Sequence, residues 1–179
     1  MYKMNLQLPK GYKRAVLVFD GAMSQPVVKV NGKEAGRWAY GYNAFRIDIT
    51  PYVHFGGKKN LVEVHLNNVE ESSRWYPGGG LYRPVSVELY GNENFSTWDT
   101  FVRTLKADKQ EAEVEVNALL EGKIGKSGKT VIALLDEAGT KVAEQTISGA
   151  TPAIKTTLKV SNPQLWSPES PYLYQVKLT

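Results

Sequence analysis

Apolar and polar residues alternate along most of the 179-residue chain. In residues 113–118, Val114, Val116 and Ala118 alternate with glutamate and asparagine side chains. This period of two is typical of a β-strand that buries one face. The same pattern occurs in residues 45–49, 61–66, 85–89, 131–135, 154–160 and 172–178. No stretch of ten or more residues has a helical period, so we expect an all-β protein.

Turn signals separate these apolar runs. Asn31-Gly32 lies between residues 27–30 and residues 34–35, and this dipeptide favours a type I′ hairpin turn, which needs a positive φ twice. Similar turn signals occur at residues 56–57, 125–128 and 136–139. Many short strands separated by Gly, Pro and Asn are typical of β-sandwiches, whereas a parallel barrel would alternate strands with helices.

The chain length suits two sandwiches of about 90 residues each. One expected strand ends near Tyr90, and a new series of strands starts around Thr97. We therefore place a boundary at Gly91 and expect one domain over residues 1–91 and a second over residues 92–179.

Charge and hydropathy exclude two classes of partner. Residues 1–91 hold 12 Lys/Arg and 7 Asp/Glu, and residues 92–179 hold 10 and 11, so the net charges are +5 and −1. The basic residues are scattered and no nucleic-acid motif accompanies them, so we expect no nucleic-acid partner. No apolar run approaches the ~20 residues of a membrane span, and the first residues lack the apolar core of a signal peptide. A bacterial cytoplasm and a periplasm are both compatible with this chain.

Residues for metal, thiol or cofactor chemistry are sparse. The chain has no cysteine, which excludes disulfides and thiol chemistry. His54 and His65 are its two histidines, and no Cys, Asp or Glu ligand pattern accompanies them, so we expect no metal site. The three glycines at residues 78–80 lack the spacing and the following Lys of a phosphate loop, so we expect no cofactor.

The clearest candidate for binding is the segment at residues 73–83, SRWYPGGGLYR. Arg74, Trp75 and Tyr76 together offer a flat apolar face and several hydrogen-bond donors. That combination suits a sugar ring, which packs its C–H face on aromatic rings and hydrogen-bonds through its hydroxyls. From the residues alone we favour the alternative that Trp75 and Tyr82 fill the sandwich core or a domain interface.

A second aromatic group consists of Trp38, Tyr40 and Tyr42. If this segment is a strand, the period of two places all three rings on one face, where they would form a platform for a sugar. Packing over the sandwich core or against another domain explains the same residues, and we favour packing.

The order of motifs along the chain resembles the N-terminal part of glycoside hydrolase family 2, which includes β-galactosidases, β-glucuronidases and β-mannosidases. The matching positions are Gly21, residues 30–33, Gly41-Tyr42 with Phe45, residues 48–50, Asn60-Leu61, residues 73–83 and residues 162–174. The resemblance implies a jelly-roll-like, sugar-binding β-sandwich followed by an immunoglobulin-like sandwich. In the family, a catalytic (β/α)8 barrel with two catalytic glutamates follows these sandwiches.

From this resemblance we expect the chain to be a non-catalytic region of a retaining β-galactosidase-like enzyme. It would buttress the missing barrel, and Arg74, Trp75 and Tyr76 would shape the pocket for a β-glycoside. The family's jelly roll usually begins several tens of residues earlier, so we expect an incomplete first sandwich that lacks its first strands and has an exposed edge strand that could pair with another chain. A free-standing carbohydrate-binding module or a structural interaction domain is the alternative.

Overall fold

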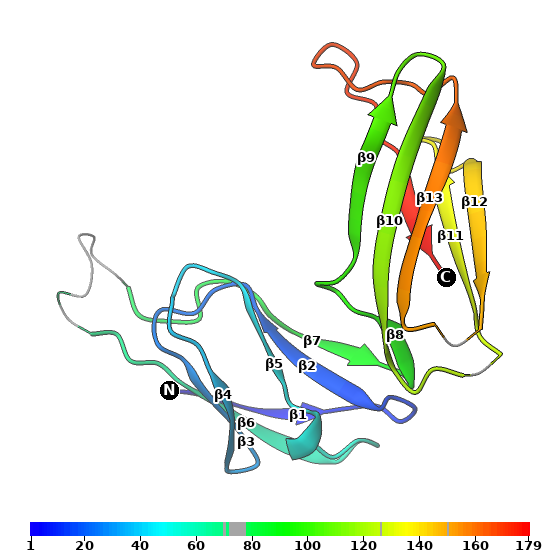
Figure 1. Cartoon of the computed structure of the whole chain (residues 1–179). Coiled ribbons are helices and arrows are strands. Elements are labelled where there is room, and N and C mark those ends of the chain that lie inside the picture. Colours follow the sequence, from blue (N-terminus) through cyan, green and yellow to red (C-terminus); the bar gives the residue numbers. More distant parts are fainter. Residues whose placement is uncertain (70, 72–77, 126, 150) are drawn as a thin grey trace. The chain divides into compact units, whose positions relative to one another are not determined.

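The chain folds almost entirely into antiparallel strands joined by turns (Figure 1). The computed structural model describes residues 1–69, 71, 78–125, 127–149 and 151–179. These residues form two units, Met1–Asn92 and Glu93–Thr179, each with its own apolar core. The described part of the chain has one helical turn, η1 at Thr50–Tyr52, and no helix long and apolar enough to cross a membrane.

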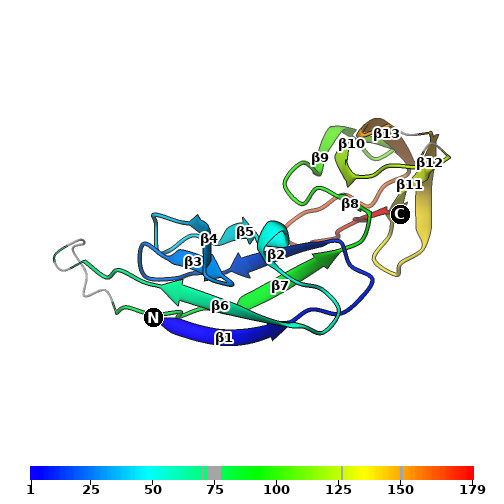
Figure 2. The same ribbon diagram turned by 90° about the horizontal axis from the view of Figure 1, so that it is seen from below.

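The first unit is a sandwich of two antiparallel sheets (Figure 2). One sheet has the strand order β1-β6-β3-β4, and the other has the order β5-β2-β7. The strands are β1 (Tyr2–Gln7), β2 (Arg14–Phe19), β3 (Val27–Val30), β4 (Lys33–Arg37), β5 (Phe45–Asp48), β6 (Lys59–His65) and β7 (Val85–Tyr90). The strands predicted around residues 45–49, 61–66 and 85–89 are therefore confirmed.

The hairpin between β3 and β4 turns at Asn31 and Gly32, whose φ angles are 51° and 81°. Positive φ at both positions is the geometry of a type I′ turn, so the predicted hairpin is confirmed. The Asn31 side chain also ties the turn to the rest of the unit. Its Oδ1 accepts a hydrogen bond from the Leu61 amide at 2.9 Å, and its Nδ2 donates to the Tyr52 carbonyl at 2.8 Å.

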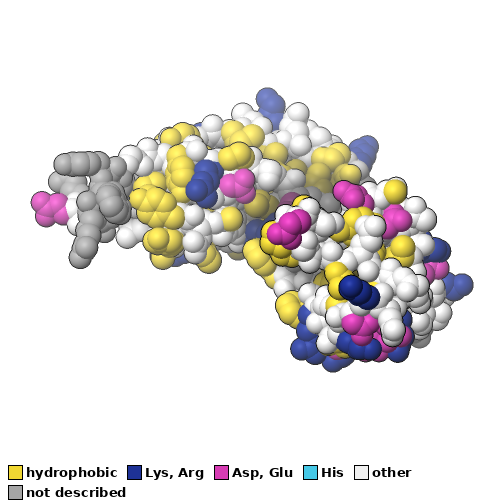
Figure 3. Space-filling model, turned by 90° about the horizontal axis from the view of Figure 1, so that it is seen from above, with side chains coloured by type: hydrophobic (Ala, Val, Ile, Leu, Met, Phe, Trp, Pro, Cys, Tyr) yellow, Lys and Arg dark blue, Asp and Glu magenta, His cyan; other side chains and the backbone are white. Residues whose placement is uncertain are grey.

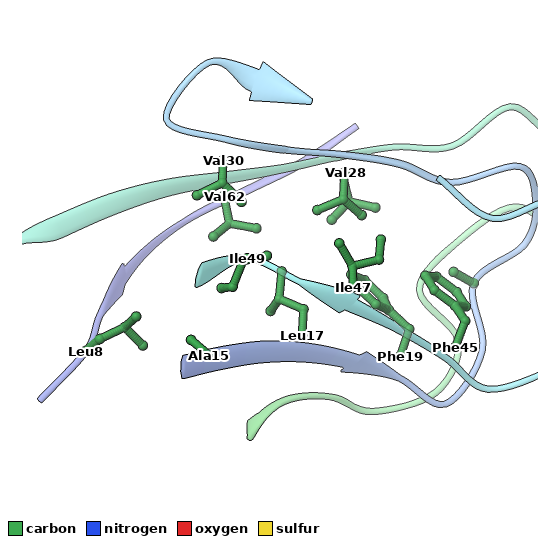
Figure 4. Packing of buried hydrophobic residues seen from close by; sticks show 12 residues of the cluster. Leu8, Ala15, Leu17, Phe19, Val28, Val30, Phe45, Ile47, Ile49 and Val62 are labelled. Atoms are coloured by element: carbon green, nitrogen blue, oxygen red, sulfur yellow. The ribbon is translucent and has the colours of Figure 1, made fainter. Parts of the chain in front are cut away.

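Apolar side chains from both sheets fill the space between the layers of the first unit (Figure 4). Leu17 and Phe19 of β2 and Ile47 of β5 belong to the same buried cluster as Val28 of β3. Phe19 stacks on Phe45 with ring centroids 4.7 Å apart and planes that are nearly parallel. Burial of one such side chain stabilises the fold by about 1.5–3 kcal/mol, so this cluster is a main source of stability in the first unit.

Asn60 of β6 is a fully buried polar residue in the first unit. Its Oδ1 accepts hydrogen bonds from the His54 amide at 2.7 Å and from Asn31 Nδ2 at 3.0 Å. Its Nδ2 donates to the carbonyls of His54 at 2.9 Å and of Leu6 and Lys58 at 3.3 Å each. One amide thus joins β1, the hairpin turn and the loop that precedes β6, which satisfies the rule that buried polar groups are hydrogen-bonded.

The second unit is a sandwich built around the long strand β10 (Glu111–Gly122). One layer consists of β10 with its neighbours β8 (Glu93–Phe95), β9 (Phe101–Ala107) and β13 (Ala153–Ser161). The other layer has the order β12-β11-β14, formed by β11 (Lys129–Leu135), β12 (Lys141–Ser148) and β14 (Gln175–Leu178). Val116, Ile132 and Leu158 are buried between the layers. The strands predicted around residues 113–118, 131–135 and 154–160 are confirmed.

Charged side chains pair across the outer face of β10. Glu115 accepts from Arg103 Nε of β9 at 2.9 Å and lies 3.2 Å from Lys155 Nζ of β13. Glu113 lies 2.8 Å from Lys159 Nζ of β13. The predicted alternation therefore holds, because Val116 and Ala118 face the core while these carboxylates face the charged side chains of the neighbouring strands.

The strand predicted over residues 172–178 is shorter than expected, because β14 covers only its last four residues. Tyr172 and Tyr174 precede the strand and pack edge to face, with ring centroids 5.1 Å apart. The Tyr174 hydroxyl accepts a hydrogen bond from the Gln164 amide at 2.9 Å, and the Tyr172 hydroxyl accepts from the Glu137 amide at 3.1 Å. The two hydroxyls thus bond to loop backbone, and residues 172–174 lie outside the sheet.

Candidate functional site

The candidate residues Arg74, Trp75 and Tyr76 lie outside the described residues, so their predicted role stays a prediction. The structure does describe the chain on both sides of them. On one side are Asn67 and Asn68, which follow β6, and on the other are residues 78–83, which lead into β7.

Residues 23 and 24 bind both flanks of the candidate segment. Met23 and Gly80 exchange two backbone hydrogen bonds, of 3.0 Å and 2.9 Å. Ser24 accepts at its carbonyl from the Asn67 amide at 2.9 Å, and its hydroxyl donates to the Asn67 carbonyl at 2.7 Å. Asn67 and Gly80, the described residues on either side of Arg74, Trp75 and Tyr76, are therefore both bonded to the same short stretch of backbone.

Tyr82 fixes the second flank by packing against two glycines. Its hydroxyl donates to the Gly41 carbonyl at 2.8 Å. A Cβ at position 21 would lie 2.7 Å from the same hydroxyl oxygen, so only glycine allows this approach. Gly41 in turn packs against Met23, where a Cβ would lie 2.5 Å from the sulfur atom. The motif glycines at positions 21 and 41 thus make room for the residues that hold the candidate segment.

Trp38, Tyr40 and Tyr42 do not lie on a strand, because β4 ends at Arg37 and residues 38–44 are irregular. The premise that they alternate on a strand face is therefore wrong. A long-range contact replaces strand pairing here, because the Gly41 carbonyl accepts a hydrogen bond from the distant Tyr82 hydroxyl and not from a neighbouring strand.

The three aromatic side chains have different surroundings. Trp38 stacks on Phe45 with centroids 5.5 Å apart and planes inclined by 8°, which extends the Phe19–Phe45 stack to the surface. The rings of Tyr40 and Tyr42 contact each other at 5.5 Å, and both are about half-exposed. Trp38 keeps 40% of its surface exposed, so it covers the core on one side and is open to a ligand on the other.

In the described part of the chain, every carboxyl group whose pKa departs from its ordinary value has a lowered pKa. In the first unit, a hydrogen bond from Arg46 lowers the pKa of Glu88, and a bond from Tyr90 adds to it. Burial alone would raise the pKa of Asp48, but hydrogen bonds from Thr50 and Arg14 outweigh it. The general acid of a glycosidase needs a pKa that is raised, so these carboxylates are suited to ion pairing and not to proton donation.

No metal centre is evident among the described residues, because no three His, Asp or Glu side chains are grouped there as ligands. On the face shown in Figure 3, charged side chains of both signs lie scattered among apolar ones. The aromatic faces and amide groups beside Trp38 can hold a neutral, polar ligand.

The sequence interpretation missed Gln25 and Asn67 as candidate site residues. Asn67 Nδ2 donates to Gln25 Oε1 at 3.0 Å, beside the segment that carries the aromatic residues. A signal for Asn67 was available, since Asn67-Asn68 follows an apolar strand and directly precedes the candidate segment. No sequence signal points to Gln25, because its side chain is positioned by a hydrogen bond to Asn67, which is distant in the sequence.

Comparison with known proteins identifies similar chains. The model of the family described as Glycosyl hydrolases family 2 matches residues 95–179. A putative β-glucuronidase of Formosa agariphila is 35% identical over 92% of this chain, and a β-galactosidase of Bacteroides ovatus is 35% identical over 87%. The chain spans only 16% and 19% of the length of these two relatives.

A solved structure resembles both units together. A glycosyl hydrolase family 2 member from Bacteroides cellulosilyticus covers 99% of this chain with a TM-score of 0.83 and 34% identity, and the chain covers 26% of it. The predicted fold class, an all-β protein of two sandwich domains, is therefore confirmed.

Proposed function

The chain belongs to glycosyl hydrolase family 2, and we propose that it is a non-catalytic region of a β-galactosidase- or β-glucuronidase-like enzyme. In this proposal a separate catalytic barrel cleaves the β-glycosidic bond with retention, and the two sandwiches buttress that barrel. The observation that carries the proposal is the alignment over 92% of this chain with a relative named a β-glucuronidase, of which the chain spans 16%.

The carboxylates of the chain support a non-catalytic role. A retaining glycosidase needs two carboxyl groups about 5–5.5 Å apart, one of them with a raised pKa. Among the described residues, the carboxyls with a shifted pKa have lowered values, and Glu88 is occupied by Arg46 at 2.6 Å. Carboxylates held in this way are poor general acids.

The segment around Arg74, Trp75 and Tyr76 is proposed to contact the sugar bound at the barrel. The described residues on its two sides, Asn67 and Gly80, are held by Ser24 and Met23. An indole and a guanidinium together offer stacking and hydrogen bonding to a pyranose ring.

Substitution of Trp75 in an enzyme that carries this region and the barrel tests the role of the segment. Trp75→Ala should lower kcat/KM for p-nitrophenyl β-galactoside or β-glucuronide about 2- to 10-fold, because one aromatic contact contributes about 0.5–1.5 kcal/mol. Tyr12→Ala, which removes another exposed aromatic ring of the first unit, is the control and should leave kcat/KM unchanged. An unchanged kcat/KM in Trp75→Ala would show that the region acts only as a structural domain.

We also propose that the first unit associates with a second copy through its β1 and β7 side. Met4 pairs with the buried Val62, and Val85 pairs with the buried Phe19, so both Met4 and Val85 lie on the core side of their sheets. Their side chains are nevertheless 56% and 39% exposed. Among the described strands β7 pairs only with β2, so its other edge is available for strand addition.

Sedimentation velocity over a range of chain concentrations tests this association. We expect larger species at high concentration, and Val85→Lys should keep the chain monomeric because a charge on that edge opposes strand addition. Val142→Lys is the control, since Val142 lies on β12 of the other unit and is equally exposed. A monomer at every concentration would contradict the proposal.

A further inference from the structure

The turn of the β3–β4 hairpin carries a dipeptide that is chemically reactive when the chain is unfolded. In an Asn-Gly pair the backbone nitrogen of glycine can attack the side-chain carbonyl carbon of asparagine, because glycine has no Cβ to hinder the approach. Asn31-Gly32 is the only Asn-Gly pair in the sequence. Whether it reacts depends on how the fold holds the Asn31 carboxamide.

Three hydrogen bonds hold this carboxamide in the folded first unit. Its Nδ2 donates to the Tyr52 carbonyl at 2.8 Å and to Asn60 Oδ1 at 3.0 Å, and its Oδ1 accepts from the Leu61 amide at 2.9 Å. The backbone is held at the same place, because the Asn31 amide donates to the Leu61 carbonyl at 2.8 Å. Asn31 is exposed, so solvent reaches the turn and the restraint on the side chain comes from these bonds rather than from burial.

Deamidation of Asn31 removes the two bonds that Nδ2 donates. The Gly32 nitrogen forms a bond to Cγ of Asn31, Nδ2 leaves as ammonia, and the Gly32 amide proton leaves with it. Water then opens the cyclic imide at one of its two carbonyls and leaves aspartate, or isoaspartate, at position 31. Because ring closure sacrifices the bonds to Tyr52 and Asn60, the closed first unit opposes the reaction and the opened unit does not.

The product does not fit the place that held the amide. An ionised carboxylate offers acceptors only. It would face the Tyr52 carbonyl and Asn60 Oδ1, which are acceptors themselves, so both would lose a donor and repel the new charge. Asn60 is fully buried and also bonds to His54 and Leu6, so the damage would extend beyond the turn. Isoaspartate lengthens the main chain inside a two-residue turn, which disturbs the β3–β4 register.

We propose that Asn31 is a deamidation site gated by the fold of the first unit. The closed unit protects the amide, and once the unit has opened, the reaction leaves a carboxylate that opposes closure. The reactants are the chain and water, and no reaction of the chain restores the amide. Openings of the first unit therefore accumulate irreversibly as destabilised chains. This property is independent of the glycosidase role proposed above.

A comparison of the folded chain with a peptide tests the gating. The 179-residue chain and a synthetic peptide of residues 27–37 are incubated in the same mildly alkaline buffer, and mass spectrometry of the digests measures the carboxyl product at position 31. We expect the chain to react at least about tenfold more slowly than the peptide, because it reacts only from opened molecules. Equal rates in the chain and the peptide would overturn the proposal.

A variant tests whether the hydrogen bonds provide the protection. Asn60→Ala removes one acceptor of Asn31 Nδ2 and should raise the deamidation rate of the chain about 3- to 10-fold. Asn5→Ala is the matched control, since Asn5 is exposed on β1, and it should keep the rate of the unaltered chain. If Asn60→Ala deamidates no faster than Asn5→Ala, the bonds to Asn31 do not protect it and the proposal is wrong.

A second variant reproduces the product. Asn31→Asp should raise the unfolding equilibrium constant of the first unit about 10- to 100-fold, because two buried-side acceptors lose their donor. Hydrogen exchange of the amides of β2 and β6 measures this constant for the first unit alone. Asn5→Asp adds the same charge at an exposed position of β1 and should change the constant less than about threefold. Equal effects of the two substitutions would contradict a product that opposes closure.

Discussion

Asn60 illustrates how a single side chain organises the first sandwich. Its five hydrogen bonds reach the backbone of Leu6, His54 and Lys58 and the side chain of Asn31. None of these partners is adjacent in the sequence, so the motif position of Asn60 could be recognised from the sequence but its role could not. The role depends on a loop and a hairpin turn that meet only in the fold.

Removal of this amide should be costly. We expect Asn60→Ala to lower the free energy of unfolding of the first unit by about 2–4 kcal/mol, because buried backbone groups lose their partners. Urea unfolding followed by fluorescence and circular dichroism measures the change. Asn5→Ala is the matched control, since Asn5 is exposed on β1, and a loss as large as that of Asn60→Ala there would contradict this account.

Trp38 shows the limit of reading aromatic residues from spacing alone. The period of two in residues 38–42 suggested a strand, but Tyr82 bonds to the Gly41 carbonyl and the segment is irregular. The stack of Trp38 on Phe45 could not be read from spacing either, because Phe45 occupies a separate element. The local pattern thus identified Trp38 as a candidate, whereas long-range packing determines where its ring lies.

Strands with one buried face were the elements that the sequence predicted best. In β10 every second residue faces the core, so the hydrophobic pattern alone identifies the strand and its orientation. The β3–β4 hairpin was predictable for a similar reason, because Asn31 and Gly32 supply the two positive φ angles locally. The end of the chain was less predictable, since the hydroxyls of Tyr172 and Tyr174 bond to loop backbone.

The charged outer face of β10 makes the second sandwich sensitive to acid. Hydrogen bonds from Asn117 and then Lys155 and Arg103 lower the pKa of Glu115, and a bond from Lys159 lowers that of Glu113. A carboxyl whose pKa is lowered in the folded state contributes stability at pH values above its ordinary pKa of 4.5. This contribution is lost as the pH falls through the pKa of the folded state. The Tm of the second unit should therefore decrease as the pH is lowered below about 4.5.

A variant separates Glu115 from the other carboxylates. Glu115→Gln should flatten the acid limb of the Tm profile, measured by calorimetry between pH 3 and pH 7, because glutamine does not titrate. Glu137→Gln, at an exposed turn position, is the control and should leave the acid limb unchanged. An acid limb equally steep in Glu115→Gln would show that the pairing across β10 does not stabilise the unit.

At the scale of the whole molecule, the fold class followed from the sequence and the functional site did not. Alternation and turn residues are local properties, so two all-β sandwiches could be predicted from them. The site depends on contacts between residues far apart, such as Met23 with Gly80 and Gln25 with Asn67. The predicted residues Arg74, Trp75 and Tyr76 lie outside the described residues, and their contribution stays a prediction.

The central claim is that this chain contributes to a glycosidase without catalysing hydrolysis itself. The most direct test is to incubate the purified 179-residue chain with p-nitrophenyl β-galactoside and β-glucuronide and to measure the release of nitrophenol. The account predicts no release above the rate of buffer alone, because the described carboxylates with shifted pKa are held as acceptors of cation and amide groups. Turnover that co-purifies with the chain, and that is abolished by replacing one of its own carboxylates, would contradict the account.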